Sequence, residues 1–214
     1  LTAPPSALHL ALSFYEAPDL PHRRLYVVPP LLRPELFQQP LGLEEPFILV
    51  YLLNRGYAED LLRWQQQHPE LKLHVFWDNT DQPDGWSPQA GIVFYHLHAE
   101  RFLEHMARCR AVVTTAGFET VSEALYLGKP LLVVPVEGHF EQRCNAHDLV
   151  TLGGGLWSPK FDLDPLLAML PPQGVPVKTT EVTARFRAWA KQAPVRILPR
   201  LLEAARQPYF PVAL

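Results

Sequence analysis

Long hydrophobic runs are absent from this sequence of 214 residues, and cysteine and methionine occur only twice each. No apolar stretch approaches the roughly 20 residues that a membrane-spanning helix needs. The first residues show no basic segment followed by an apolar one, so they do not have the pattern of a signal peptide. From these absences we expect a cytoplasmic protein.

Signs of disulfides and metal sites are scarce as well. Cys109 and Cys144 have no metal-binding spacing with each other or with a histidine, so reduced thiols are the expected state. The 9 histidines form no HExxH motif and no clustered pair with a carboxylate on one helix face. We therefore predict no metal ion, and we interpret the histidines as surface or packed residues, with His98 and His139 the two of interest.

An excess of positive charge is also absent. Acidic residues outnumber basic ones by 22 to 19, which gives a formal net charge of -3. Proteins that bind nucleic acids usually carry a basic face. No nucleic-acid partner is therefore expected.

Proline, in contrast, is abundant, with 23 residues. It clusters at 29–40 and again at 171–176, and such clusters are typical of stiff connectors. The hydrophobic share of 48% is too high for a disordered chain. The sequence has no initiator methionine and begins Leu1-Thr2-Ala3, so we expect a fragment of a longer protein.

Apolar strands alternate with helical segments through the middle of the sequence. Strands are expected at 25–28, 47–53, 71–77, 92–95, 111–114 and 131–135. Helices are expected at 57–68, 99–108, 120–127 and 140–152, and a last one at 183–206 is interrupted by Pro194 and Pro199. Strands that are apolar throughout and alternate with helices predict an α/β fold, a Rossmann-like parallel sheet with helices on both faces.

Two loops of this sheet are placed to bind an anion. In an open parallel sheet, ligands lie beyond the carboxyl ends of the strands, near the point where the strand order reverses. Residues 54–56 and 115–120 each follow a strand and lead into a helix N-terminus, which attracts phosphate. Gly117 allows close approach and backbone conformations closed to other residues, and Arg55 adds a positive charge. Gly117 could also be only a tight turn, and Arg55 only a surface charge.

The helices that follow offer partners for sugar hydroxyls. Glu123, about one turn into its helix, can accept hydrogen bonds from a vicinal diol, as acidic residues do for ribose in dinucleotide-binding folds. Glu141, Gln142 and Asn145 offer further donors and acceptors. In the structural alternative, Glu123 only complements the helix dipole, and Gln142 and Asn145 only cap their helix.

Together these residues resemble the donor-binding motif of inverting GT-B glycosyltransferases. The resemblance is carried by Thr115 to Glu123, Gly128-Lys129-Pro130, Pro135, Glu141-Gln142 and Asn145-Ala146. The sequence is similar to the lipid-II N-acetylglucosaminyltransferases and to a related family of bacterial transferases. The resemblance implies the C-terminal, donor-binding domain of such an enzyme.

The resemblance also implies a role for each position. The donor diphosphate would be held by Asn54, Arg55, Gly56, Ala116, Gly117, Phe118 and Thr120. The backbone near Leu97 and His98 would read the uracil base, and Glu123 would bind the ribose. The donor sugar would be bound by His139, Glu141, Gln142 and Asn145.

Two residues depart from the family pattern. Ala116 stands where a second glycine or a serine is common, which narrows the conformational freedom of the loop. Glu119 places a negative charge near the expected diphosphate, which is unfavourable unless the side chain points away. Both departures concern the geometry of the phosphate site and leave the expected fold unchanged.

The implied function is transfer of a hexose-type sugar from a UDP-sugar with inversion, and no cofactor is expected. Residues 1–40 would be the tail of a missing N-terminal domain plus a proline-rich linker, 41–178 the nucleotide-sugar domain, and 179–214 a helix that packs back on the junction. The catalytic base and the acceptor site would belong to the missing domain. The fragment alone is then expected to be inactive, and any peripheral contact with a membrane would be made through that domain.

Three alternatives remain. The chain could be a non-catalytic donor-binding subunit of a two-chain glycosyltransferase. A nucleotide-sugar 2-epimerase shares the fold, but its characteristic segment after the fifth strand is not matched by Val136 to Phe140. A nicotinamide-dependent oxidoreductase is disfavoured because no GxGxxG motif follows a strand.

Two other features have structural interpretations. The run Gly153-Gly154-Gly155 follows a helix, so it predicts a helix C-cap and turn in place of a dinucleotide loop. The tryptophans Trp64, Trp77 and Trp157 are interpreted as packing residues.

Overall fold

The computed structural model describes residues 8–52, 55–172, 174–177 and 180–206. Within these limits the chain forms two compact units, one of Leu32–Ala184 and a smaller one of the residues before and after it. The limits of the units differ from the expected segments 1–40, 41–178 and 179–214. The assignment of those segments to domains of a longer protein stays a prediction.

The smaller unit contains a two-stranded parallel sheet. Strand β1 (His9–Leu12) pairs with β2 (Leu25–Val28), and the short 3-10 helix η1 (Pro21–Arg23) lies between them in the chain. The sequence predicted β2 but not β1. The indole nitrogen of Trp189 donates a hydrogen bond of 2.9 Å to the carbonyl oxygen of Ser13 and so ties the C-terminal helical region to the strand region.

The C-terminal stretch, predicted as one interrupted helix, forms two helices. These are α6 (Glu181–Ala190), in which the division between the units falls, and α7 (Ala193–Arg206). Pro194 is the second residue of α7. Proline is tolerated there because a backbone N–H at this position would have no hydrogen-bond partner within the helix. Pro199 lies inside α7.

The larger unit is built on a six-stranded sheet in which every neighbouring pair is parallel. Its strand order is β5-β4-β3-β6-β7-β8. The bounds are β3 (Ile48–Leu52), β4 (Leu73–Trp77), β5 (Ile92–His96), β6 (Ala111–Thr114), β7 (Leu131–Val133) and β8 (Leu156–Trp157). The direction of winding reverses between β3 and β6, the point at which this fold binds its ligands.

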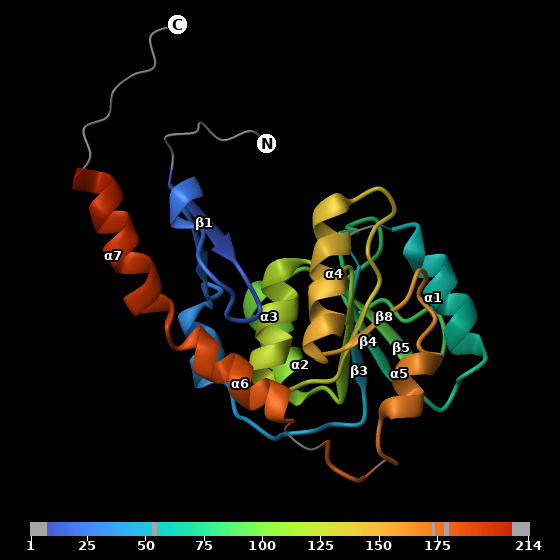
Figure 1. Cartoon of the computed structure of the whole chain (residues 1–214). Coiled ribbons are helices and arrows are strands. Elements are labelled where there is room, and N and C mark those ends of the chain that lie inside the picture. Colours follow the sequence, from blue (N-terminus) through green and yellow to red (C-terminus); the bar gives the residue numbers. More distant parts are fainter. Residues whose placement is uncertain (1–7, 53–54, 173, 178–179, 207–214) are drawn as a thin grey trace, which may run out of the picture. The chain divides into compact units, whose positions relative to one another are not determined.

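Helices cover both faces of the sheet, so the predicted fold class is confirmed (Figure 1). Figure 1 shows α1 and α5 on one face, and α2, α3 and α4 on the other. The bounds are η2 (Pro34–Gln38), α1 (Tyr57–Gln66), α2 (Ala99–Arg108), α3 (Phe118–Leu127), α4 (Phe140–Leu152) and α5 (Asp164–Met169). The bounds of α2 and α4 are as predicted, whereas α3 begins two residues earlier than the predicted 120–127.

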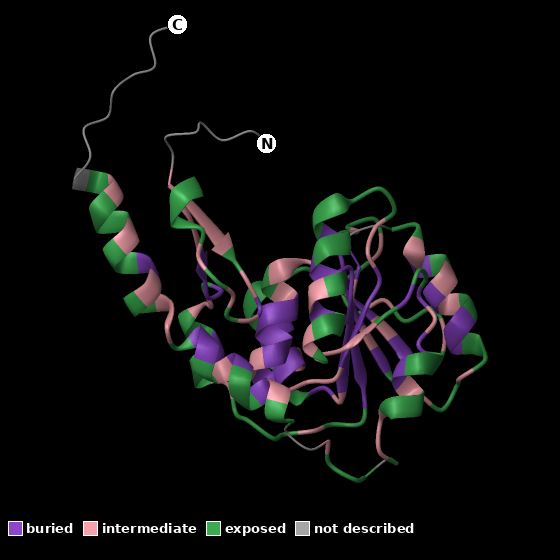
Figure 2. Cartoon of the chain, in the orientation of Figure 1, coloured by how far each residue is buried: buried purple, intermediate pink, exposed green. Residues whose placement is uncertain are grey.

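The core lies on both sides of the strands, which Figure 2 shows buried between the helices. On one face, Val50 and Val75 pack against Leu61 of α1 and Leu166 of α5, and all four side chains are fully buried. Burial of each such side chain contributes roughly 1.5–3 kcal/mol. Strands that are buried on both faces need apolar residues at every position, which explains the continuous apolar runs in the sequence.

The triple glycine after α4 has a packing role. Gly153 ends the helix with a left-handed backbone (φ 73°), as predicted for a C-cap. At Gly155 a Cβ atom would lie 2.7 Å from the carbonyl oxygen of Leu131. The absence of a side chain there lets the chain return close beside β7, and β8 follows directly.

The chemistry of the thiols agrees with the expected reduced state. Cys109 is buried and Cys144 exposed, and both are free. Burial raises the pKa of Cys109 to about 12. None of the helices in the described part of the chain combines the length and the apolar character needed to cross a membrane.

Candidate functional site

Two loops meet where the strand order reverses. β3 and β6 are neighbours in the sheet, with Val50 opposite Val113, so the loops at their carboxyl ends are adjacent. The first loop leads through Arg55 and Gly56 into α1, while Asn54 lies outside the described residues. The second loop runs from Thr115 to Gly117 and leads into α3.

The β6–α3 loop turns at Ala116, not at Gly117. Ala116 has a left-handed backbone (φ 62°), whereas Gly117 is extended (φ −65°). The expectation that Gly117 supplies a conformation closed to other residues is therefore wrong. A left-handed alanine is strained by roughly 1–2 kcal/mol, and such strain is often found at functional sites.

A hydrogen bond from α4 holds the strained residue. The side-chain nitrogen of Asn145 donates to the carbonyl oxygen of Ala116 over 3.0 Å, and both residues are buried. Asn145, predicted to contact the donor sugar, thus has a structural role in shaping the loop. Gly117 is then the N-cap residue of α3, with no side-chain cap of its own. This end of α3 therefore has no side-chain cap from Gly117, and a helix N-terminus attracts an anion.

Three buried hydroxyl groups surround this loop without a hydrogen-bond partner among the described residues. They belong to Thr114, Thr115 and Ser122, each fully buried. A buried hydroxyl that stays unsatisfied costs about 1–3 kcal/mol, so native proteins rarely leave one without a purpose. The hydroxyls thus mark the loop and the first turns of α3 as a region whose polar groups are not all satisfied by the described residues.

Glu123, predicted to bind ribose, is buried and paired with Arg33. The guanidinium donates one hydrogen bond from Nε to Oε1, at 2.6 Å, and another from Nη2 to Oε2, at 2.7 Å. A third bond runs from Nη1 of Arg33 to the carbonyl oxygen of Ala99 over 3.3 Å. The hydrogen bond with Glu123 raises the pKa of Arg33. Glu123 is the sixth residue of α3, and the helix dipole fades within the first turn, so the dipole alternative explains little here.

Sequence reasoning placed Arg33 only in the proline-rich linker and missed its contact with the site. No local signal identifies it, because its partner lies 90 positions away. An arginine isolated among prolines is the one hint that the sequence offers.

Arg55 is engaged by the loop that follows β4. Its Nε donates to the carbonyl oxygen of Asp78 over 3.0 Å, and its Nη1 lies 2.7 Å from a carboxylate oxygen of Asp81. Both partners of the ion pair are largely exposed, and exposed pairs contribute little to stability. A phosphate could compete for this guanidinium, and the predicted contact stays a prediction.

The N-terminus of α4 is capped by His139. Its Nδ1 accepts a hydrogen bond of 3.3 Å from the backbone nitrogen of Gln142. The side chain of Gln142 is buried and accepts from the backbone nitrogen of Val136 over 2.8 Å. The alternative in which Gln142 or Asn145 caps the helix is therefore wrong. Glu141 is exposed beside them. The predicted donor-sugar role of His139, Glu141, Gln142 and Asn145 stays a prediction.

The expected base-reading segment lies after β5, at Leu97 and His98. The Nδ1 atom of His98 accepts a hydrogen bond of 3.3 Å from the backbone nitrogen of Arg101 and so caps α2. Arg101 is held by Asp84 through two bonds of 2.7 Å. The side chain of Leu97 is exposed. The segment is thus fixed at its end, which suits a backbone that reads a base edge.

The remaining predicted phosphate residues sit at the start of α3. Phe118 is its first residue, and Gly117, Phe118 and Thr120 are all partly exposed. Glu119 is exposed, so its carboxylate is solvated and not buried at the loop. Its charge nevertheless raises the pKa of Arg33, behind the larger effects of Glu123 and Glu35.

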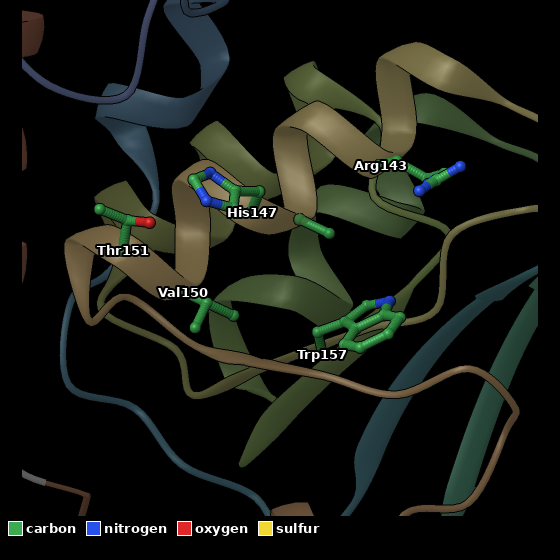
Figure 3. Close-up of a pocket in the computed structure, with 6 residues that line it drawn as sticks. Arg143, His147, Val150, Thr151 and Trp157 are labelled. Atoms are coloured by element: carbon green, nitrogen blue, oxygen red, sulfur yellow. The ribbon is translucent and has the colours of Figure 1, made fainter.

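A cavity of about 400 Å³ lies elsewhere on the larger unit, along the exposed side of α4 (Figure 3). It is lined by Arg143, Ala146, His147, Val150, Thr151 and Trp157. None of the predicted donor residues in the described part of the chain lines it. Trp157 is 57% exposed, so its interpretation as a packing residue is wrong, whereas Trp64 and Trp77 are buried as expected.

A histidine pair joins β4 and α2. Nδ1 of His74 and Nδ1 of His105 are 3.1 Å apart, and the ring of His74 stacks on Phe47. Burial lowers the pKa of His74 to about 4, and it also lowers that of His105. In the described part of the chain no group of three or more residues of metal-binding type comes together. The pair is half-buried and packs between β4 and α2.

Comparison with known proteins identifies the family of the chain. A family model described as "Glycosyl transferase family 1" matches residues 1–170. An uncharacterized glycosyltransferase of Methanosarcina acetivorans is 28% identical over 129 residues, which are 58% of this chain and 34% of that protein. A UDP-N-acetylglucosamine–N-acetylmuramyl-(pentapeptide) pyrophosphoryl-undecaprenol N-acetylglucosamine transferase of Bifidobacterium longum is 39% identical over 90 residues, 40% of this chain and 23% of that protein.

A solved structure, that of the kitacinnamycin glycosyltransferase, has a similar fold. Its TM-score is 0.59 at 15% identity, and the match covers 87% of this chain and 50% of that one. The chain thus corresponds to about a third or less of the length of the two curated relatives and to half of the solved one. The resemblance to GT-B and lipid-II transferases is confirmed.

Proposed function

Because the chain belongs to glycosyl transferase family 1, we propose that it binds the nucleotide-sugar donor in a glycosyltransferase that inverts the anomeric centre. The donor is a UDP-sugar of the hexose type. One observation carries the proposal: at the reversal of strand order, a strained loop and a helix N-terminus without a side-chain cap lie with a buried carboxylate and with buried hydroxyls that have no partner among the described residues.

The diphosphate binds at the β6–α3 loop in this proposal. The backbone N–H groups at the start of α3 and the helix dipole favour an anion there. The hydroxyl of Thr115 supplies a neutral donor. Gly56 precedes α1 in the adjacent loop and offers a second helix N-terminus, with Arg55 as a nearby cation.

The ribose binds to Glu123. The carboxylate lies about one turn beyond the start of α3, so a nucleoside whose diphosphate rests on that N-terminus has its ribose close to it. The uracil base then reaches the backbone at Leu97 and His98. On the other side of the phosphates, His139 and Glu141 at the start of α4 would meet the sugar, and both residues are exposed.

In the reaction this chain would stabilise the leaving group. Inverting transfer needs a base that takes the proton of the acceptor and an electrophilic site that holds the departing diphosphate. Helix N-termini supply the second need without a metal ion. The base and the acceptor site would come from a further, N-terminal domain, so the isolated chain would bind donor without transferring sugar.

Thermal unfolding in the presence of nucleotides tests this proposal. UDP at 100 times its dissociation constant should add about 2.7 kcal/mol of stability, which corresponds to a rise in Tm of several degrees, at roughly 2–4 °C per kcal/mol. GDP, ADP, dTDP and NAD at the same concentration should give smaller shifts. Equal shifts with all of them, or none with UDP, would contradict the proposal.

A variant pair assigns the shift to the site. Glu123→Gln should lose most of the UDP effect because the amide is a poorer acceptor for the ribose diol. Glu59→Gln, on the exposed surface of α1, should keep the full shift.

A further inference from the structure

The pair of Arg33 and Glu123 bears on how the ribose site works. Both oxygens of Glu123 are bound by the guanidinium in a two-pronged geometry, at 2.6 and 2.7 Å. Only 8% of the Glu123 side chain is exposed, against 30% for Arg33. The inference below rests on the proposed function, since it concerns the same nucleotide site.

A nucleotide cannot readily replace Arg33. Removal of one partner of a buried ion pair leaves the other charge uncompensated in a medium of low polarity, which is strongly unfavourable. Two neutral hydroxyls would not compensate a buried carboxylate as a guanidinium does. The ribose therefore has to bind to the intact pair.

The intact pair still has room for a ribose hydroxyl. A carboxylate offers about four lone-pair positions, and the guanidinium occupies one on each oxygen. One position remains on each oxygen, and because these two point away from each other, a ribose hydroxyl binds to one of them. The rigid fork of arginine also fixes the plane of the carboxylate, so the free positions keep a constant direction.

Arg33 also changes the charge of the site. Glu123 and Glu119 both lie near the proposed diphosphate, and both act electrostatically on Arg33, as does Glu35. Without a cation these carboxylates would repel a diphosphate. The guanidinium offsets the charge of Glu123 where an anion is to bind.

The backbone around Arg33 is anchored for this role. Four residues later, the ring of Phe37 makes an edge contact with Tyr126 of α3, at 5.2 Å between centroids. Leu36 between them is fully buried. The segment from Arg33 to Phe37 therefore lies along α3 and contacts it at two points one turn apart, Glu123 and Tyr126.

From these contacts we propose that Arg33 is a positioning residue of the donor site. It orients the carboxylate of Glu123 so that a ribose hydroxyl binds to a free acceptor position on one oxygen, and it offsets the negative charge next to the diphosphate. A nucleoside diphosphate that carries the 2′-hydroxyl is the ligand that this pair selects.

The test compares UDP with 2′-deoxy-UDP by calorimetry on the full chain. A hydrogen bond to a charged group contributes about 1.5–3 kcal/mol, so the wild type should bind UDP roughly 10-fold or more tighter than the deoxy form. In Arg33→Gln that ratio should fall towards one, and UDP itself should bind roughly 10-fold or more weakly. Arg33→Lys, which keeps the charge but loses the fork, should recover part of the UDP affinity and little of the ratio.

A control variant separates this role from general stability. Arg63→Gln removes an arginine that pairs with Asp60 on the exposed surface of α1, and it should leave both affinities unchanged. The ratio of the two affinities is insensitive to a partial loss of folded protein, so it remains readable even if Arg33→Gln is less stable.

Each other outcome has a distinct meaning. If the wild type binds neither nucleotide, the proposed function fails and the role of Arg33 fails with it. If the wild type discriminates and Arg33→Gln discriminates equally, the site stands but Arg33 is not its positioning residue. If Arg33→Gln binds UDP more tightly, arginine and ribose compete for Glu123, which also overturns the proposal.

Discussion

Asn145 of α4 donates a hydrogen bond of 3.0 Å to the carbonyl oxygen of Ala116, the one left-handed residue of the β6–α3 loop. The bond joins two elements that follow different strands of the sheet. It keeps an alanine in a conformation that this residue seldom adopts alone. The shape of the candidate phosphate loop therefore depends on a side chain of the next helix.

Loss of this bond should be costly. Asn145→Ala leaves the carbonyl oxygen of Ala116 buried without its donor, which destabilises the folded state by about 1–3 kcal/mol. Urea unfolding measures the difference. Cys144→Ala, a change at an exposed position of the same helix, should alter stability by less than about 0.5 kcal/mol. Equal effects of the two variants would show that the bond is not important.

Two glycine variants separate a packing glycine from one that faces a ligand. In Gly155→Ala the new Cβ would lie 2.8 Å from Cβ of Leu131 and 2.7 Å from its carbonyl oxygen, and such overpacking costs about 1–3 kcal/mol. In Gly117→Ala the Cβ meets no atom within 4 Å, and the backbone there is extended. That variant should be as stable as the wild type, or up to about 1 kcal/mol more stable.

The second variant should still bind UDP more weakly, because its methyl group would stand where the proposed site brings the phosphates close to the backbone. Thermal unfolding with and without UDP measures both properties. An unchanged UDP shift in Gly117→Ala would mean that Gly117 serves only the turn.

Two neighbouring arginines provide a matched pair for stability. Arg110 is mostly buried, donates Nε to Glu44 over 2.9 Å and also bonds the carbonyl oxygens of Pro171 and Pro172. Arg108 is exposed and bonds Glu45 over 3.2 Å. Arg110→Met should lose about 3 kcal/mol, and Arg108→Met less than about 1 kcal/mol. Similar losses in urea unfolding would contradict the difference in burial.

The histidine pair should make stability depend on pH. Burial, aided by the charge of His105 and opposed by that of Glu45, holds the pKa of His74 at about 4 in the folded state. An unfolded histidine has a pKa of about 6.5. Between these values the unfolded chain binds a proton that the folded chain does not, so stability falls as the pH falls.

The measurement is the free energy of unfolding at pH 7 and at pH 5. The wild type should lose more stability over this interval than His74→Gln. His147→Gln, at an exposed position, should keep the slope of the wild type. His105 contributes in the same direction, because its pKa is also lowered, by burial and by Arg101. A slope that is unchanged in His74→Gln would mean that other groups dominate.

The fold was largely readable from the sequence because its signals are local. The strands are continuous apolar runs, and the ends of α2 and α4 are set by residues within a few positions of them. β1 and β8 were missed since each is short, and β8 has only two residues. Such short strands are stabilised by pairing with a neighbouring strand, and the hydrophobic periodicity of the sequence does not reveal that pairing.

The candidate site was readable only in part. The loop after β6 and the position of Glu123 follow from a motif, but the partner of Glu123 does not, because Arg33 reaches it through the tertiary fold. The left-handed turn was assigned to Gly117 on propensity alone. In the structure the bond from Asn145 overrides propensity and places the turn at Ala116.

The two histidine caps fix a tautomer. His98 and His139 each accept a backbone hydrogen bond at Nδ1, and an imidazole nitrogen accepts only when it carries no proton. The proton of each neutral ring must then reside on Nε2. Both helices that begin after β5 and β7 thus present an exposed imidazole whose outer nitrogen is a donor. A ligand at that edge of the sheet therefore meets N–H donors from these two rings, and it needs acceptor atoms to form hydrogen bonds with them.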